Sequence, residues 1–555
     1  MAIAVTNQRD MYSRASMAST VQSWWRVLLG VMALMFSLSV TAESGFQNAV
    51  QALNAKNFSA KGGAIKALVE LGDPRSKAVL EAMLNGKLFY RKSDKKVVIA
   101  EKTENGYQIT DPLDGNEIGD VGRREVKKIG VNNRLRSQLR AALALLNLRN
   151  PDADIRLTSI KAMYGSIDAA GAGLLTKIIE QDSDKRVVQA AQTAIALYEL
   201  KNGGTEEKVA AIERLSGNLE QVVRNELAEI VEADSSAVDS KVRNAAESAL
   251  QVINGKLQFN SLVETTFFGL SLGSVLLLAA IGLAITFGVM GVINMAHGEL
   301  IMLGAYTTYL VQQAMPEHID ISLFVAIPAA FLVSGLFGVA MERGIIRHLY
   351  GRPLETLLAT FGISLVLQQL VRTTISAQNV AVANPSWMSG SFDVNAALSL
   401  TNNRLYIIIF ALAVFLLLLL ILKKTALGLQ VRAVAQNRPM AKAMGIRSDW
   451  VDAMTFGLGA GIAGVAGVAL SQLTNVGPNM GQSYIIDSFM VVVFGGVGNL
   501  WGTLVGALSL GIANKYLEPW SGAVLAKIFV LVFIILFIQK RPRGLFPQKG
   551  RAAEN

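Results

Sequence analysis

The side chains most able to do chemistry in this chain lie in the apolar segment Gly288–Tyr306. Its sequence, GVMGVINMAHGELIMLGAY, brings Asn294, His297 and Glu299 close together along the chain. Polar and ionisable groups cost free energy at membrane depth, so they normally line a cavity or a path rather than face lipid. Four glycines interrupt this stretch: Gly288, Gly291, Gly298 and Gly304. Glycine-interrupted helices mark the substrate route in many transporters.

Two interpretations of this segment are open. In the first it is a broken helix that lines a translocation path or gates it, and in the second it is a cytoplasmic turn that leaves Glu299 solvated. The cost of polar groups in lipid favours the broken helix. Asn294 can donate and accept hydrogen bonds and would suit contact with a small solute. His297 and Glu299 would instead hold the broken backbone by bonding its freed amides and carbonyls.

A second broken segment is predicted at residues 494–499, which read FGGVGN. Its glycines would break the helix, with Asn499 at the break, and the alternative is a tight turn. Seven residues from the two segments are assigned to the path or its gate: Asn294, His297, Gly298, Glu299, Gly495, Gly496 and Asn499. No cofactor and no metal site is predicted.

The 555 residues divide into two parts of different character. Residues 43–260 are rich in Ala, Lys, Glu and Asp, whereas long apolar runs dominate residues 261–547 and leave a short tail at 548–555. The contrast predicts one globular part and one polytopic membrane domain. The net charge of +10 does not indicate nucleic-acid binding, because basic residues of the second part cluster beside apolar runs. Cytoplasmic loops of membrane proteins have this pattern.

A secretory signal peptide is predicted at residues 1–42. Arg26 precedes the apolar run Val27–Leu38, and Val40-Thr41-Ala42 forms a small-residue cleavage site. The run is too short to span a membrane comfortably. The leader before Arg26 is long, so translation starting at Met11 or Met17 is an alternative. Cleavage would place residues 43–260 in the periplasm, and the absence of cysteine neither supports nor opposes that compartment.

Residues 43–260 are expected to form a stack of HEAT-like helix pairs. An Asp-rich motif opens several Ala-rich amphipathic helices, as in Asp152–Arg156, Asp182–Arg186 and Asp239–Arg243. Asp is a good N-cap residue, and one helix pair cannot bury its apolar face alone. Between about 87 and 130, β-branched residues and Asn-Gly and Asp-Gly pairs predict a small β insertion. No nucleophile–base pair is evident, so an interaction surface is favoured over an active site.

The second part is predicted to be an all-α membrane domain of about eight spans plus broken or re-entrant segments. The apolar segments are Phe267–Met290, Leu300–Met315, Ile321–Met341, Leu354–Val371, Leu405–Leu422, Val451–Leu473, Ile485–Val497, Leu500–Ala513 and Val524–Ile538. If the first span runs inward, all three basic clusters, near 343–352, 423–450 and 540–551, fall in the cytoplasm. The glycine-dense stretch Gly457–Gly467 indicates close helix packing rather than a dinucleotide site, since no strand precedes it.

Three separated motifs resemble the permease subunits of branched-chain amino acid type ABC importers. They are Gly291–Tyr306, the loop Arg432–Arg447 (RAVAQNRPMAKAMGIR) with the glycine-rich helix after it, and Val491–Gly502. The resemblance covers residues 261–547. The large extension before residue 261 is similar to the arrangement in the urea ABC transporter permease subunit of the same family.

The resemblance implies a multi-pass protein of the bacterial inner membrane that forms half of a channel with a second, related permease. Two ATPase subunits would bind from the cytoplasm, and a periplasmic binding protein would deliver substrate. No G-x-x-x-x-G-K-[ST] phosphate loop occurs, so ATP hydrolysis belongs to other chains and this chain is not an enzyme. The implied ATPase coupling loop contains Arg432, Arg438, Ala441, Lys442, Gly445 and Arg447. Ala441 and Gly445 fit the family spacing, whereas Pro439 and Met440 replace its Glu and Ala.

Urea is the first expected substrate, and branched-chain amino acids are the second. A passive channel with a periplasmic sensor domain is a third hypothesis, which the coupling-like loop argues against. A membrane-anchored enzyme is the least favoured, because His297, His318 and His348 are scattered along the chain.

Overall fold

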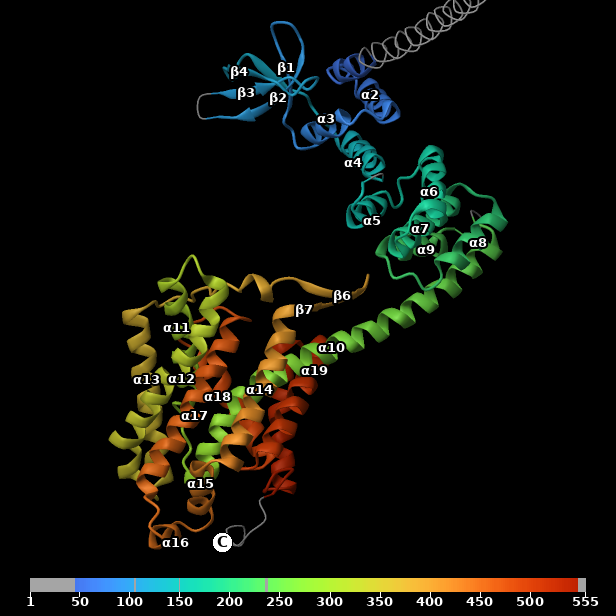
Figure 1. Ribbon diagram of the computed structural model, residues 1–555. Helices are drawn as coiled ribbons and strands as arrows, with labels where there is room; N and C mark the ends of the chain where they lie inside the picture. Colours follow the sequence, from blue (N-terminus) through green and yellow to red (C-terminus); the bar gives the residue numbers. More distant parts are fainter. Residues whose placement is uncertain (1–44, 104–105, 149, 235–237, 548–555) are drawn as a thin grey trace, which may run out of the picture. The chain divides into compact units, whose positions relative to one another are not determined.

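The computed structural model describes residues 45–103, 106–148, 150–234 and 238–547. The predicted signal peptide and the tail at 548–555 lie outside the described residues. The chain forms two compact units that divide between Ile253 and Asn254, whereas the domain boundary at 260/261 stays a prediction. Both units are mostly helical, and the strands are confined to two small sheets (Figure 1).

The first unit contains a series of short helices. They are α2 (Phe58–Leu71), α3 (Arg75–Leu84), α4 (Asn133–Asn147), α5 (Ala153–Ala162), α6 (Ala169–Gln181), α7 (Lys185–Asn202), α8 (Thr205–Leu215) and α9 (Gln221–Glu232). Asp152 caps α5 by accepting from the Asp154 amide at 2.9 Å, which confirms the capping role expected of the Asp motif. The classification of these helices as HEAT-like stays a prediction.

A bidentate ion pair joins α5 to the end of α6 in this unit. Arg156 donates to both carboxylate oxygens of Asp182, at 2.8 and 2.9 Å. This pairing holds the pKa of the Asp182 carboxyl below its ordinary value. The Asp motif therefore caps helices and also bonds one helix to its neighbour.

The β insertion is a five-stranded antiparallel sheet with the order β4-β3-β2-β1-β5. Its strands are β1 (Leu88–Arg91), β2 (Val97–Lys102), β3 (Tyr107–Thr110), β4 (Glu117–Val121) and β5 (Val126–Lys128). All five lie within the stretch predicted at 87–130. Phe89 of β1 is opposite Val98 of β2, and both belong to a small apolar cluster with Ile109.

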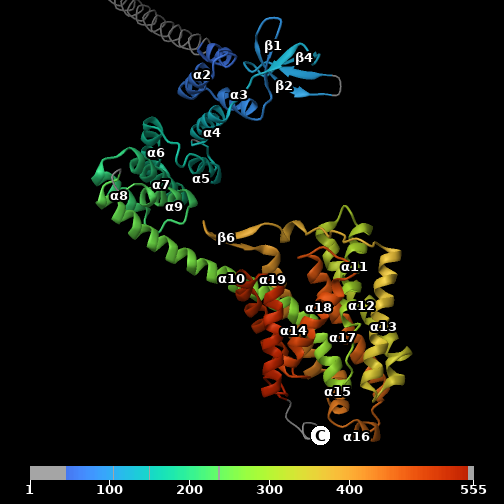
Figure 2. The same cartoon turned by 180° about the vertical axis from the view of Figure 1, so that it is seen from behind.

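The second unit is a helical bundle that begins within α10. Its helices are α10 (Ser240–Met290), α11 (His297–Ala314), α12 (Ile319–Gly344), α13 (Pro353–Thr374), α14 (Asn402–Lys424), α15 (Ala426–Gln436), α16 (Arg438–Ala443), α17 (Ser448–Ser471), α18 (Met480–Gly495) and α19 (Leu500–Lys540). The hairpin β6 (Ser391–Asn395) and β7 (Leu398–Thr401) lies at the end of the bundle opposite to α16 (Figures 1 and 2).

In the described part of the chain, six helices are long and apolar enough to cross a membrane: α10, α12, α13, α14, α17 and α19. Two apolar segments expected separately, Leu500–Ala513 and Val524–Ile538, both lie in α19. Gly522, whose φ of 78° and ψ of 161° are not helical, divides α19 into two helices just after Pro519. The number of about eight membrane spans stays a prediction.

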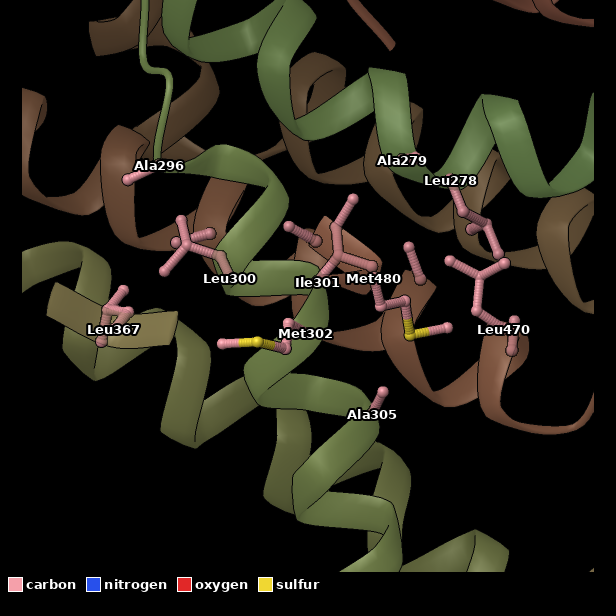
Figure 3. Close-up of a cluster of buried hydrophobic side chains, with 14 of the residues drawn as sticks. Leu278, Ala279, Ala296, Leu300, Ile301, Met302, Ala305, Leu367, Leu470 and Met480 are labelled. Atoms are coloured by element: carbon pink, nitrogen blue, oxygen red, sulfur yellow. The ribbon is translucent and has the colours of Figure 1, made fainter. Parts of the chain in front are cut away.

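Glycines bring the helices of the bundle into direct backbone contact. A Cβ on Gly467 of α17 would collide with the carbonyl oxygen of Ile301 of α11, and one on Gly464 would lie 2.5 Å from that of Ala330 of α12. The glycine-dense stretch therefore serves close packing, as predicted. Figure 3 shows buried apolar side chains of the bundle in one cluster, among them Leu278, Ile301, Leu367, Leu470 and Met480.

Candidate functional site

The first broken segment turns back into the bundle. α10 ends at Met290, Gly291 takes a positive φ of 65°, and α11 starts at His297. The Nε2 atom of His297 lies 2.8 Å from the carbonyl oxygen of Ala279. Ala279 precedes Met290 by eleven residues, which is about 16 Å along a helix. α11 therefore starts well inside the bundle, beside the middle of the apolar part of α10.

The first turns of α11 and α18 meet at this depth. Gly298 and Gly481 are the second residues of the two helices, and a Cβ on Gly298 would collide with the carbonyl oxygen of Gly481. The first turn of a helix has unpaired backbone N–H groups and a partial positive charge. A carboxylate is favourable there, and Glu299 supplies one: a Cβ on Gly481 would lie 2.7 Å from its Oε2 atom.

The carboxylate of Glu299 is bonded on one oxygen only. Its Oε1 atom accepts hydrogen bonds from Ser364 Oγ at 2.9 Å and from Gln368 Nε2 at 2.8 Å, both on α13. Its Oε2 atom has no hydrogen-bond partner among the described residues, although the side chain is buried. One acceptor thus anchors α13 to α11, and the other is left for a group that the chain does not supply.

Three more buried polar atoms of this region have no partner in the described part of the chain. They are Asn294 Nδ2, His297 Nδ1 and the Tyr306 hydroxyl. The Oδ1 atom of Asn294 accepts from the Ala296 amide at 3.0 Å, so only its donor side is free. Buried polar groups without partners are costly and usually find a ligand or water. Donors and an acceptor are therefore available around the start of α11.

A polar stripe on α13 faces the broken segment. Four buried residues at every fourth position form it: Thr356, Thr360, Ser364 and Gln368. The Met295 amide donates to Thr360 Oγ1 at 3.1 Å, so the stripe bonds the freed backbone as well as Glu299. The sequence analysis missed these residues, although their spacing within the apolar segment Leu354–Val371 was a readable signal.

The structure corrects the role expected for two of the predicted residues. Glu299 does not bond the freed backbone; it bonds side chains of α13. His297 contacts a backbone carbonyl, but that carbonyl belongs to α10 rather than to the broken stretch. Asn294 bonds the freed backbone instead, through the Ala296 amide.

Among the described residues no group of three or more His, Asp or Glu side chains could hold a metal ion.

The second segment, at 494–499, lies apart from Glu299. A Cβ on Gly288, near the end of α10, would collide with the Cα atom of Gly498. Asn499 caps α19 by accepting from the amides of Trp501 and Gly502, at 3.1 and 3.2 Å. Gly496 takes a φ of 106°, which only glycine adopts without strain. The segment is a tight, capped connection between α18 and α19, and a gating role for Gly495, Gly496 and Asn499 stays a prediction.

The loop at 432–447 contains α15, the short helix α16 and a glycine turn. Asn437 caps α16 by accepting from the Met440 amide at 3.0 Å. Gly445, with a φ of 85°, donates to the carbonyl oxygen of Lys442 at 3.0 Å and ends the helix. Ala441 is buried, and Arg432 donates to the carbonyl oxygen of Leu422. Met440, Lys442, Met444 and Arg447 are among the exposed residues of the loop.

Comparisons with known proteins agree on the second unit. Residues 265–538 match the family described as "Branched-chain amino acid transport system / permease component". The chain is 32% identical, over 297 residues, to the high-affinity branched-chain amino acid transport system permease protein LivH of Salmonella typhimurium; the match covers 52% of this chain and 96% of LivH.

Two more distant transport proteins also match part of the chain. The permease protein BraD of Pseudomonas aeruginosa, from a high-affinity branched-chain amino acid transport system, is 30% identical over 287 residues, which are 50% of this chain and 93% of BraD. The ribose import permease protein RbsC of Haemophilus influenzae is 25% identical over 264 residues, covering 44% of this chain and 74% of RbsC. No solved structure matches the chain.

Proposed function

Because this chain belongs to the family of branched-chain amino acid transport permeases, we propose that it is a permease subunit of an ATP-driven importer in the bacterial inner membrane. It pairs with a second, related permease to enclose the translocation path. Two ATPase subunits bind the permease pair from the cytoplasm, one of them on the loop at 432–447, and a periplasmic binding protein delivers the substrate. The exposed Met440 and Met444 beside Lys442 and Arg447 support the docking role, since they offer both apolar and basic contacts.

The half-bonded carboxylate of Glu299 is the observation that carries the substrate proposal. A free carboxylate oxygen at the meeting point of two helix starts binds N–H groups of a solute, and it disfavours an anion. The free Nδ2 atom of Asn294 donates in return to a solute carbonyl. The substrate class is therefore a small nitrogen compound with several N–H donors and one carbonyl or carboxyl group.

Urea is the first substrate that we propose. It presents four N–H donors and one carbonyl acceptor without a charge, which suits a free carboxylate oxygen beside a free amide donor. The extension before the permease unit, which resembles the arrangement in urea permeases, supports the same choice. The binding protein would contribute to the selection of urea together with this site.

Branched-chain amino acids are the second candidate, which the names of LivH and BraD favour. Glu299 would bind the ammonium group of a zwitterion. Arg372, one helical turn beyond Gln368, would bind its carboxylate; it now donates to Asn479 Oδ1 at 2.6 Å. Urea has no carboxylate for Arg372 to bind. Replacing Arg372 should therefore impair uptake of an amino acid but not uptake of urea.

Uptake of labelled urea and labelled leucine tests the proposal in cells deleted for this chain and complemented with variants. We expect the wild-type gene to restore urea uptake, and Arg372→Gln to restore it equally well. If the wild-type gene restores leucine uptake and Arg372→Gln does not, the amino acid candidate is correct instead. Glu317→Gln, which changes an exposed carboxylate of the same unit, is the control. Uptake of both solutes that persists when the ATPase genes are deleted would refute an ATP-driven importer.

A further inference from the structure

A charged cluster underlies the loop at 432–447. Arg438, the first residue of α16, forms an ion pair with Asp452 in the first turns of α17. Its guanidinium also stacks on the ring of Tyr350, with 3.9 Å between the guanidinium carbon and the ring centroid. Glu342, near the end of α12, interacts electrostatically with Asp452. We call Arg438, Asp452, Tyr350 and Glu342 the Arg438 cluster; none of the last three was singled out from the sequence.

The two carboxylates of the Arg438 cluster are buried but incompletely bonded. Asp452 and Glu342 are 4% and 2% exposed, so both carboxylates are shielded from solvent. Three atoms have no hydrogen-bond partner among the described residues: Glu342 Oε2, Asp452 Oδ1 and Arg438 Nε. Glu342 forms a loose ion pair with Arg343, at 3.7 Å, and also interacts electrostatically with Arg347. A fully satisfied network would fix one arrangement, whereas this one retains bonding capacity for a second arrangement.

α17 connects the Arg438 cluster with the broken segment. Two turns beyond Asp452, a Cβ on Gly459 would lie 2.7 Å from the carbonyl oxygen of Gly282, and one on Gly282 would lie 2.9 Å from the His297 ring. Further along, Gly467 contacts the backbone of Ile301 in α11. Contacts between backbones contain no flexible side chain to absorb a displacement. A shift of α17 at Asp452 is therefore transmitted to the start of α11.

We propose that Arg438 is the positioning residue through which movement of α16 is coupled to α17 and, through α17, to the site around Glu299. The inference rests on the proposed function, because it requires an ATPase to move α16. When α16 is displaced, the guanidinium must slide over Tyr350 and exchange its bonds with the two carboxylates. The free oxygens of Asp452 and Glu342 are the acceptors for the second arrangement.

The test uses the complete complex of this chain, its second permease and its ATPase, reconstituted with the binding protein. Labelled urea transported per ATP hydrolysed is measured, or labelled leucine if the cells take up leucine. Arg438→Ala is expected to lower this ratio by roughly threefold to thirtyfold, the range of a coupling energy between linked sites. The ATPase should still copurify at the wild-type level. Arg438→Ala/Asp452→Ala should leave the ratio low, because neither end of the link between α16 and α17 remains. Recovery of the ratio in this double variant would show that Arg438→Ala acts only by leaving a buried carboxylate unpaired.

Arg352→Ala is the matched control, since Arg352 forms an exposed ion pair with Glu355 at 3.2 Å in the same unit. If Arg438→Ala is not recovered as folded protein, Arg438→Lys replaces it, because lysine keeps the charge but loses the planar stack on Tyr350. Transport and ATP hydrolysis that fall in parallel, with an unchanged ratio, would show that Arg438 only stabilises the fold. A wild-type complex that binds no ATPase would instead refute the proposed function.

Discussion

The two oxygens of the Glu299 carboxylate have different surroundings, and this difference gives the first prediction. Glu299→Gln keeps an acceptor for Ser364 and Gln368 but places an N–H₂ donor where the free oxygen was. Glu299→Ala removes both. If the free oxygen binds the solute, uptake falls by about tenfold or more in each variant, the loss expected for one charged hydrogen bond.

The control for this prediction is Ser364→Ala, which removes one bond to Glu299 Oε1 and leaves Oε2 unchanged. We expect Ser364→Ala to retain more uptake than Glu299→Gln at equal expression. Equal uptake by Glu299→Gln and the wild type would show that the carboxylate only joins α11 to α13.

Solute access to the site is the second prediction. The chain contains no cysteine, so Asn294→Cys introduces a single reactive thiol. We expect this thiol to react with a water-soluble thiol reagent in the assembled complex, and substrate or the ATPase state should change the rate. Ile528→Cys on the exposed apolar face of α19 is the control that lipid should protect. If the thiol introduced by Asn294→Cys is unreactive in every state, a path at this place is contradicted.

The sequence predicted the polar residues of this site but not their partners. Asn294, His297 and Glu299 stand out because polar groups in an apolar run are costly. Their burial agrees with a place inside the bundle rather than in a solvated turn. Ser364 and Gln368, however, lie 65 and 69 residues from Glu299 along the chain. Only the packing of α13 against α11 brings them together, and no local pattern specifies that pairing.

At the scale of elements, the turn that ends α16 gives the third prediction. Gly445 has a φ of 85°, and a Cβ there would meet no atom within 4 Å. Gly445→Leu therefore introduces backbone strain of roughly 1–2 kcal/mol and a side chain on the docking surface. Gly445→Asn introduces less strain, because asparagine tolerates this conformation.

We expect Gly445→Leu to reduce both uptake and copurification of the ATPase while the protein remains in the membrane, and Gly445→Asn to reduce them less. The measurement is uptake together with the amount of ATPase recovered with the tagged permease. Normal uptake by Gly445→Leu at normal expression would refute the docking assignment.

A second prediction at this scale concerns an ion pair between α18 and the C-terminal half of α19. Lys527 donates to Asp487 Oδ2 at 3.0 Å, within two apolar helices and beyond the bend at Gly522. Removing one partner leaves a charge in an apolar environment, which costs roughly 2–3 kcal/mol. We expect Asp487→Ala and Lys527→Ala each to lower the unfolding temperature of the detergent-purified protein, and Asp487→Asn/Lys527→Gln to lower it less. Additive losses in Asp487→Ala/Lys527→Ala, relative to the two single variants, would show that the two groups do not interact.

Hydropathy located the apolar segments of the bundle but not how they join. It separated Leu500–Ala513 from Val524–Ile538, because Lys515, Glu518 and Pro519 lie between them. The structure also divides α19 into two helices, but the division lies at Gly522, beyond these three residues. Hydropathy also could not show that α11 starts inside the bundle, since that depends on the contact of His297 with Ala279.

At the scale of the whole molecule, the basic clusters of the second unit gather at one end of the bundle. Arg438 stacks on Tyr350, which brings the connections at 345–352 and 425–447 together. Val289, at the end of α10, packs against the apolar cluster of α15, α16 and α17. The neighbouring Gly288 contacts Gly498, and the amide of Leu545 donates to the carbonyl oxygen of Phe494 at 2.9 Å. The segment after α19 therefore lies at the same end.

This shared end gives the last prediction, because loops rich in Lys and Arg stay in the cytoplasm. The loop at 423–450 and the C-terminal segment should then be cytoplasmic, while the hairpin β6–β7 and residues 43–260 should be periplasmic. We expect a reporter that is active only in the periplasm to be active when fused after Gly255 and inactive when fused after Arg438. A reporter active only in the cytoplasm should give the reverse result at both positions, which controls for expression. Periplasmic activity at Arg438 would reverse the orientation and would also remove the docking loop from the reach of a cytoplasmic ATPase.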